Sequence, residues 1–220
     1  MTPKELISQT RLLETSEIPK HLVATFAFNP TEPFGETSND LNVDFRIEVV
    51  EELLHDFSKK DFPLIRQLYK EELACERLIW RHDNIYQLSY YLFELGQLED
   101  CFLIYEAKYQ INHMDIATMM DREMLTVGHD INKVISFVSQ KFKDNTELSV
   151  RFGGLLEELI DLKENPDYNN SEEYKIFLKG YFWGHDTKPS IKVNKKERDA
   201  YLRQVFPSIN FRKPWWKFWN

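Results

Sequence analysis

The sequence predicts an all-α protein, built as an irregular α-α superhelical array or bundle of about nine to ten short helices. Three observations support this prediction. The chain has only 7 glycines in 220 residues. Its long apolar-periodic segments are rich in Leu, Glu and Lys, which favour helices. The connections between these segments are short, so successive helices are expected to pack as antiparallel neighbours. No exact repeat period is visible, and we expect residues 1–220 to form a single helical domain.

The first part of the chain predicts one helix followed by a loop. The helix is expected from Pro3 to Glu14. Residues 22–28 form a short apolar stretch between two prolines, which is either extended or a helical turn. Residues 29–42 contain two prolines, a glycine and several Ser, Thr and Asn residues, which is loop composition. Because long loops are uncommon, this loop is the candidate for a functional one.

Two helices are predicted next from apolar residues at helical spacing. The first stripe consists of Phe45, Val49, Val50, Leu53 and Phe57. Asp61 is the expected N-cap of the second helix. Pro63 lies in the first turn of that helix, where its missing N–H costs little.

A helical hairpin is predicted between residues 84 and 125, centred on Leu95-Gly96. The stripe before the turn is Ile85, Leu88, Leu92 and Leu95. Gly96 stands where a left-handed C-cap is expected. The second helix has acidic residues in its first turn and Lys108 in its last. One side of it is lined by Leu98, Phe102, Tyr105 and Tyr109. Hairpins of this kind stack into scaffolds that bind other proteins.

Further helices are expected towards the C-terminus. Asp130 is the expected N-cap of the first of them. Gly153-Gly154 lies inside the second, where each glycine costs about 1 kcal/mol, so close helix packing or a kink is expected there. Ser171 opens the third, and a capping box starts the last at Asn194. Residues 207–220 form an aromatic and basic C-terminal tail.

The charge distribution argues against nucleic-acid binding and suggests a basic partner. The formal net charge is −8, whereas nucleic-acid binding needs a positive field. Residues 41–110 carry 14 acidic and 8 basic side chains, and residues 191–220 carry 8 basic and 2 acidic ones. An acidic body can steer a basic partner towards it. The same pattern is also typical of an ordinary solvated surface.

A cytoplasmic protein with reduced cysteines is expected. The first residues lead into a polar helix pattern without the apolar region of a signal peptide. No run approaches the roughly 18 apolar residues that are needed to span a bilayer. Cys75 and Cys101 lie on apolar helix faces and not in a Cys-x-x-Cys motif. Buried free thiols are therefore expected rather than a disulfide or a metal site.

Residues 90–108 resemble the Leu-Gly turn of tetratricopeptide-type helical hairpins; they read Tyr-Tyr-Leu-Phe-Glu-Leu-Gly-Gln-Leu-Glu-Asp-Cys-Phe-Leu-Ile-Tyr-Glu-Ala-Lys. They are still more similar to a bacterial group of uncharacterised helical proteins. The later positions of that group are matched here by Asn112, Asp115, Asp121 and Leu125. The ending Lys213-Pro-Trp-Trp-Lys-Phe-Trp is similar to endings of small bacterial proteins, including immunity proteins that neutralise antibacterial toxins.

His-Asp pairs suggest a metal-dependent enzyme as the alternative. They occur at His55-Asp56, His82-Asp83, His129-Asp130 and His185-Asp186. The pattern is similar to that of helical HD phosphohydrolases, in which imidazole and carboxylate groups hold a metal that activates water. The closest assignment of ligands is His55, His82, Asp83 and Asp130. The other interpretation is structural, because Asp83 and Asp130 both precede apolar helical stripes, where capping carboxylates are expected.

Other catalytic motifs are missing from the sequence. The chain has no Gly-x-Ser-x-Gly elbow and no glycine-rich phosphate loop. Neighbouring carboxylates such as Glu157-Glu158 lie on predicted helix faces, where a solvated surface is expected. We therefore predict a non-enzymatic protein that needs no cofactor.

The predicted function is to bind and block a protein, as the immunity protein of an antibacterial toxin does. Such an inhibitor needs complementary charge for fast association and a few buried aromatic residues for slow release. The residues expected to bind a basic toxin domain are Asp83, Tyr86, Tyr90, Glu94, Glu99 and Asp100. The tail contributes Trp215, Trp216 and Trp219, which anchor the partner, contact a membrane interface or fold back onto the helices.

Overall fold

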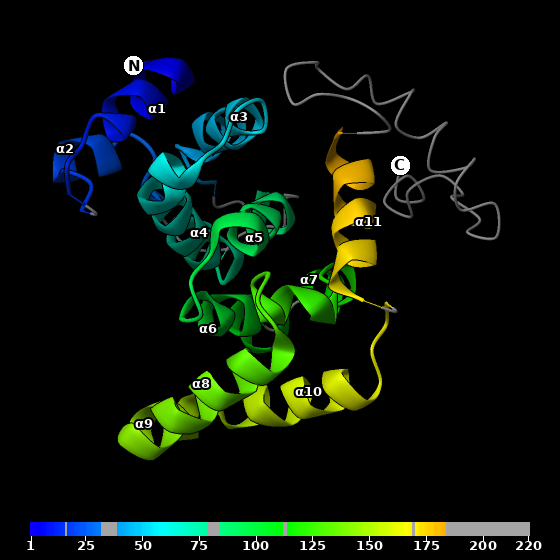
Figure 1. Ribbon diagram of the computed structural model, residues 1–220. Helices are drawn as coiled ribbons and strands as arrows, with labels where there is room; N and C mark the ends of the chain where they lie inside the picture. The colour runs from blue at the N-terminus through cyan, green and yellow to red at the C-terminus, as the bar shows by residue number, and fades with distance from the viewer. Residues whose placement is uncertain (16, 32–38, 79–83, 112–113, 169, 184–220) are drawn as a thin grey trace, which may run out of the picture. The chain divides into compact units, whose positions relative to one another are not determined.

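A computed structural model confirms the predicted all-α class over the residues that it describes (Figure 1). These are residues 1–15, 17–31, 39–78, 84–111, 114–168 and 170–183. They contain eleven α-helices and no β-strand, and one isolated antiparallel bridge joins Pro30 to Asp40. The chain divides into two compact units, Met1–Ser171 and Glu172–Asn220. The single domain over residues 1–220 stays a prediction.

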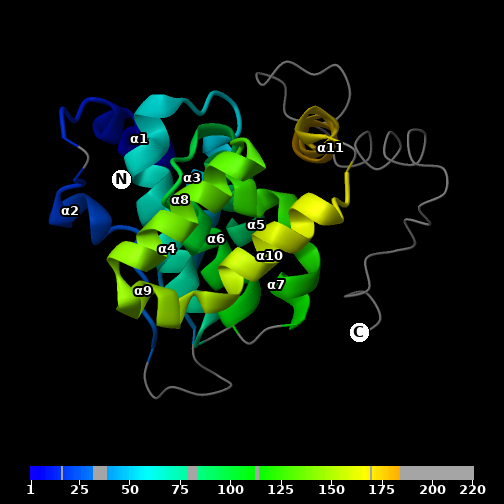
Figure 2. The same cartoon turned by 60° about the horizontal axis from the view of Figure 1, so that its bottom comes forward.

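Unit 1 holds ten of these α-helices and three irregular turns. The helices are α1 (Pro3–Arg11), α2 (Lys20–Val23), α3 (Val43–Leu53), α4 (Phe62–Glu76), α5 (Asn84–Leu95), α6 (Asp100–Tyr105), α7 (Met114–Met119), α8 (Ile131–Asp144), α9 (Thr146–Arg151) and α10 (Gly153–Glu164). The turns are the 3₁₀ turns η1 (Lys59–Asp61) and η3 (Arg122–Thr126) and the π-helical turn η2 (Glu106–Gln110). Figure 1 shows α8, α9 and α10 grouped on the side of the unit away from α1, α2 and α3, and in Figure 2 the same three helices face the viewer.

Helix α5 forms the centre of unit 1. Nine of its twelve residues are buried, so it is enclosed on all sides. It packs most extensively along α4, where the hydroxyls of Tyr69 and Ser89 share a hydrogen bond of 3.0 Å. The hydroxyl of Tyr91 donates to the carbonyl oxygen of Val50 in α3 at 2.7 Å. A helix that is apolar all round belongs to an interior position, so α5 holds the neighbouring helices together.

Gly96 is required for a different reason from the one predicted. The predicted left-handed C-cap is wrong, because Gly128 is the one glycine with a positive φ among the described residues, at 71°. A Cβ atom on Gly96 would lie 2.1 Å from the carbonyl oxygen of Leu92, which accepts the N–H of Gly96 at 2.6 Å. The close approach of backbone at the end of α5 therefore excludes a side chain. A tetratricopeptide-like hairpin formed by α5 and α6 stays a prediction.

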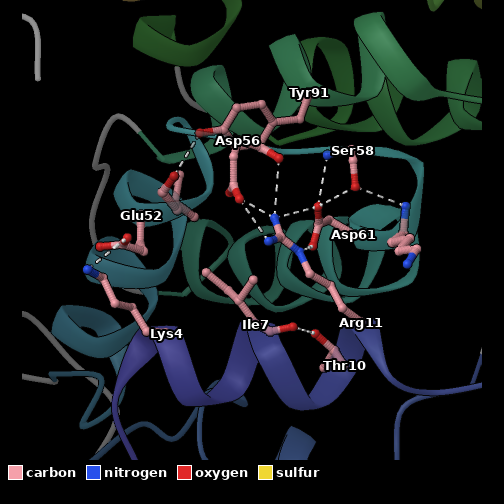
Figure 3. A network of polar contacts seen from close by, with 11 residues as sticks. Lys4, Ile7, Thr10, Arg11, Glu52, Asp56, Ser58, Asp61 and Tyr91 are labelled. Carbon is pink, nitrogen blue, oxygen red and sulfur yellow. Dashed lines mark hydrogen bonds and ion pairs between the residues drawn. The ribbon is translucent and has the colours of Figure 1, made fainter. Parts of the chain in front are cut away.

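An arginine joins α1 to the end of α3 and to η1 (Figure 3). Arg11 donates from Nε to Asp61 Oδ1 at 2.6 Å and from Nη1 to Asp56 Oδ2 at 2.9 Å. Asp61 is fully buried, and its Oδ2 accepts the N–H of Ser58 at 2.8 Å. Asp61 stands at the N-cap position of α4, as predicted, but its side chain makes no capping hydrogen bond to α4, because its carboxylate caps η1 and neutralises Arg11. Pro63 lies in the first turn of α4, as predicted.

A second ion cluster is wholly buried between α3 and α4. Arg46 pairs with Asp40 through Nη2 and Oδ2 at 2.5 Å, and with Glu72 through Nε and Oε1 at 2.5 Å. Asn84 donates from Nδ2 to the same Glu72 oxygen at 3.2 Å. Buried charges require such partners, because desolvation of an isolated charge is costly. The cluster attaches the described ends of the predicted 29–42 loop to the helices, while residues 32–38 lie outside the described residues.

The helix α11 (Ser171–Trp183) begins at Ser171 as predicted, and from Glu172 onward it is the described part of unit 2. Tyr174, Leu178 and Phe182 recur at intervals of four residues and are buried. The rings of Tyr174 and Phe177 stack with centroids 6.2 Å apart. Within the described residues of either unit, no helix combines the length and the apolar character that crossing a bilayer requires.

Candidate protein-binding site

The structure separates the residues that were predicted to bind a partner. Asp83, Trp215, Trp216 and Trp219 lie outside the described residues. Buried positions are occupied by Tyr86, Tyr90 and Asp100, whereas Glu94 is half-buried and Glu99 is exposed. The hydroxyl of Tyr86 donates to the Asp121 carboxylate at 3.3 Å. The predicted residues therefore do not form one continuous exposed patch within the described part of the chain.

Tyr90 and Asp100 belong to the core, which corrects the prediction that they contact a partner. Oδ2 of Asp100 accepts the N–H of Gln97 at 2.8 Å, and its Oδ1 lies 2.7 Å from Nε of Arg66. Burial nevertheless raises the pKa of Asp100 above its ordinary value. The Tyr90 ring meets the ring of Phe57 edge-on, with centroids 5.8 Å apart. Both residues are fully enclosed, and Asp100 stabilises the turn between α5 and α6 through its bond to Gln97.

The alternative metal ligands are only partly within the described residues. His82 and Asp83 lie outside them, and His55 is half-buried just after α3. Asp130 caps α8 as predicted, since its Oδ1 accepts the N–H groups of Asn132 and Lys133 at 3.0 and 3.2 Å. Among the residues with described positions, no three His, Cys, Asp or Glu side chains group so that they could hold a metal ion. The metal-dependent enzyme stays an untested alternative.

A more exposed group of aromatic residues lies where η2 meets α9 and α10. The rings of Tyr105 and Tyr109 lie one helical turn apart with centroids at 4.9 Å and an angle of 31° between their planes. Tyr105 also meets Phe152 edge-on at 6.2 Å. Tyr105 is half-buried, and Tyr109 is 37 % exposed. Two neighbouring tyrosines therefore present ring surface to solvent on a rigid support.

Gly154 allows Tyr105 to reach the first turn of α10. A Cβ atom at Gly154 would lie 2.4 Å from the Tyr105 hydroxyl oxygen, whereas a Cβ at Gly153 would meet nothing within 4 Å. The close packing predicted for this glycine pair is thus confirmed at Gly154. Both glycines lie in the first turn of α10 and not in the middle of a longer helix, because α9 ends at Arg151 and α10 begins at Gly153.

Two glutamates of α10 complete this group. The Tyr109 hydroxyl donates to Oε2 of Glu158 at 2.7 Å. Burial raises the pKa of Tyr105, and the charges of Glu158 and Glu157 raise it further. Burial, the hydrogen bond to Glu158 and the charge of Glu158 raise the pKa of Tyr109. Both hydroxyls therefore remain protonated next to negative carboxylates. We call Tyr105, Tyr109, Glu157 and Glu158 the tyrosine–glutamate site.

The π-helical turn η2 directs Lys108 inward beneath this site. Its ammonium donates to the carbonyl oxygens of Ala117 and Met120 at 2.5 and 2.6 Å, which satisfies the end of α7. Lys108 Nζ also lies 5.3 Å from the centroid of the Tyr109 ring. Burial lowers the pKa of Lys108. π-helical turns insert an extra residue into a helix and are frequent at functional sites. Here the turn places the Lys108 ammonium against the Tyr109 ring.

The charge of unit 1 favours attraction of cations to its surface. Residues 1–171 carry 31 acidic and 17 basic side chains, a net charge of −14. Residues 172–220 carry 5 acidic and 11 basic side chains, a net charge of +6. The acidic body and the basic end noted in the sequence therefore coincide with the two structural units. A net charge of this size raises the association rate of a basic partner.

The sequence indicated the residues of the tyrosine–glutamate site separately but did not predict that they lie together in the fold. The tyrosines, the glycine pair and Glu157-Glu158 were each singled out as local features. Tyr109 and Glu158 are separated by 49 residues. No local spacing connects positions so far apart in an irregular helical array, so only the fold reveals the site.

Comparisons with protein-family models, with curated protein sequences and with solved structures gave no significant match.

Proposed function

We propose that this chain is a non-enzymatic binding protein that engages a basic protein partner through the tyrosine–glutamate site. The observation that carries the proposal is the contact of the Tyr105 and Tyr109 rings, with Tyr109 bonded to Glu158, on the surface of a unit with a net charge of −14. The resemblance of residues 90–108 and of the chain ending favours one such role. In that role the protein binds and blocks an antibacterial toxin in the bacterial cytoplasm, as an immunity protein.

The chemistry of the site suits lysine or arginine side chains of a partner. Tyrosine is enriched among the residues that dominate protein interfaces. A cation above an exposed aromatic ring gains about 0.5–1 kcal/mol, and more when it is desolvated. The Glu158 carboxylate accepts the Tyr109 hydroxyl, so one partner cation can contact a ring face and this carboxylate together, and Glu157 adds a second negative charge on the next residue. The acidic field of unit 1 then acts mainly on the association rate.

Affinity capture from the native cell tests this proposal. The bait is the full-length tagged protein, the site variant is Glu157→Lys/Glu158→Lys, and the control is Asp144→Lys/Glu147→Lys. The four residues replaced in these two variants all lie at helix surfaces, and both variants change the net charge by the same amount. We expect a basic protein that the wild type and the control capture and the site variant loses.

The captured protein is then expressed alone and together with each bait. An immunity function predicts growth arrest by the partner alone and rescue by the wild type and the control. The association rate should fall about 10- to 100-fold in the site variant, as expected when steering charges are reversed. Equal capture and equal association rates for all three baits would refute the assignment of the site.

A further inference from the structure

We propose that Arg77 and Arg151 form a second contact of the same interface, which receives an acidic side chain of the partner. This inference rests on the proposed function and adds the chemistry of the partner. The partner would carry a carboxylate beside an apolar residue, a short distance from the basic group that the tyrosine–glutamate site engages. The following observations support this placement.

Two arginines from distant parts of the chain converge on one carboxylate oxygen. Arg77 at the end of α4 and Arg151 at the end of α9 both donate from Nη2 to Oε1 of Glu106; the Arg151 distance is 2.8 Å. Glu106 begins η2, directly after Tyr105. The backbone carbonyl of Arg151 accepts from Nε2 of Gln110 at 2.6 Å. The arginine pair therefore adjoins the tyrosine–glutamate site through Glu106, which follows Tyr105, and through Phe152, whose ring lies near both Tyr105 and Arg151.

The charges of this cluster do not balance. Among the residues that the structure describes, two guanidinium groups face one carboxylate, which leaves a net charge of +1 within a unit of net charge −14. The Glu106 side chain is 8 % exposed, whereas the side chains of Arg77 and Arg151 are 46 % and 59 % exposed. Each guanidinium has five N–H donors in a fixed fork, so donors remain directed at solvent. A second carboxylate can bridge the two arginines from outside by charge-assisted hydrogen bonds.

Apolar side chains beside the arginines favour a protein carboxylate over a free small anion. Leu78 follows Arg77 and is 58 % exposed, and Val150 precedes Arg151 and is 81 % exposed. The Arg151 guanidinium also lies 4.9 Å from the centroid of the Phe152 ring, which holds it in place. Arginines with neighbouring apolar and aromatic residues are typical of interface hot spots. An acidic residue with an apolar neighbour matches both the charge and the apolar surface.

The test uses small probes and therefore does not depend on the identity of the partner. The full-length protein is titrated with acetyl-Asp-Leu-amide, with acetyl-Asn-Leu-amide and with inorganic phosphate. Binding is followed by NMR at the arginine Nε–Hε signals, and Arg77→Gln and Arg151→Gln assign the two signals of interest. We expect the aspartate peptide to shift both signals saturably. The concentration at which it does so should be at least about tenfold below the concentration that the asparagine peptide requires. Phosphate should bind more weakly than the aspartate peptide.

Arg151→Gln should weaken binding of the aspartate peptide about tenfold. The control is Lys143→Gln on α8, which also removes one exposed cation but lies outside the arginine pair and should leave this binding unchanged. Arg77 still neutralises Glu106 in Arg151→Gln, so the fold is retained, and a melting curve checks this. Equal binding of the two peptides, equal binding by Arg151→Gln, or tighter saturable binding of phosphate would each overturn the proposal. None of these results affects the capture experiment, so the two proposals fail independently.

Discussion

Replacement of Gly154 by alanine tests the packing that builds the tyrosine–glutamate site. The new Cβ would lie 2.4 Å from the Tyr105 hydroxyl oxygen, so the tyrosine ring has to move. Overpacking of this kind costs about 1–3 kcal/mol. Alanine in place of glycine in a helix gains about 1 kcal/mol. The net expectation for Gly154→Ala is a loss of stability of about 1 kcal/mol.

Gly153→Ala is the matched control for this prediction. The same methyl group is added one residue earlier, where it meets no atom within 4 Å. Only the gain in helix propensity remains, and stability should rise by up to about 1 kcal/mol. The two variants should therefore differ by about 2 kcal/mol, or about 4–8 °C in melting temperature for a chain of this size.

Urea unfolding followed by circular dichroism measures both variants, and the NMR signals of the Tyr105 ring report its displacement. Gly154→Ala should also weaken partner capture, whereas Gly153→Ala should leave it unchanged. If Gly154→Ala were as stable as Gly153→Ala, the contact between Tyr105 and α10 would not exist in solution. The reasoning that places the tyrosine–glutamate site would then be wrong.

Three further predictions concern buried polar groups. Arg11→Ala leaves the Asp61 carboxylate buried without its cation and should cost about 3 kcal/mol in urea unfolding, whereas Lys60→Ala next to it should cost less than about 0.5 kcal/mol. Burial raises the pKa of the Glu123 carboxyl above its ordinary value of 4.5. The contribution of Glu123 to the free energy of unfolding is therefore largest below pH 4.5 and is lost as the pH rises through the folded-state pKa. Glu123→Gln should therefore gain stability relative to the wild type from pH 4 to pH 7, and a constant difference would contradict this. Burial raises the pKa of the Cys75 thiol to about 12 and also raises that of Cys101, so a thiol reagent at pH 8 should react with both cysteines only after unfolding; rapid labelling of the native protein would contradict this.

Local features of the fold could be predicted from the sequence because their causes are local. The N-cap at Asp130, the proline in the first turn of α4 and the start of α11 at Ser171 each depend on residues within one helical turn. Apolar spacing of three or four residues likewise identifies a helix before its neighbours are known. The all-α class follows from these signals, since each is a property of a short segment.

Roles that depend on distant residues could not be predicted. Asp61 has the sequence context of a helix cap, but Arg11 from α1 recruits its carboxylate. Tyr90 and Asp100 have the composition of an interface, but Tyr90 lies on the enclosed helix α5 and Asp100 at the start of α6, and both are buried in the core. A tyrosine or an aspartate is compatible with either position, because burial depends on which helices pack around it.

The sequence by itself determined the helices, caps such as that at Asp130, and the separation of acidic and basic residues along the chain. Tertiary structure alone decided which side chains meet. It brought Tyr109 to Glu158 and placed Gly154 against Tyr105. The physical reason is that helix formation is encoded over three to four residues, whereas a surface site is assembled from segments whose contacts depend on the packing of the whole unit.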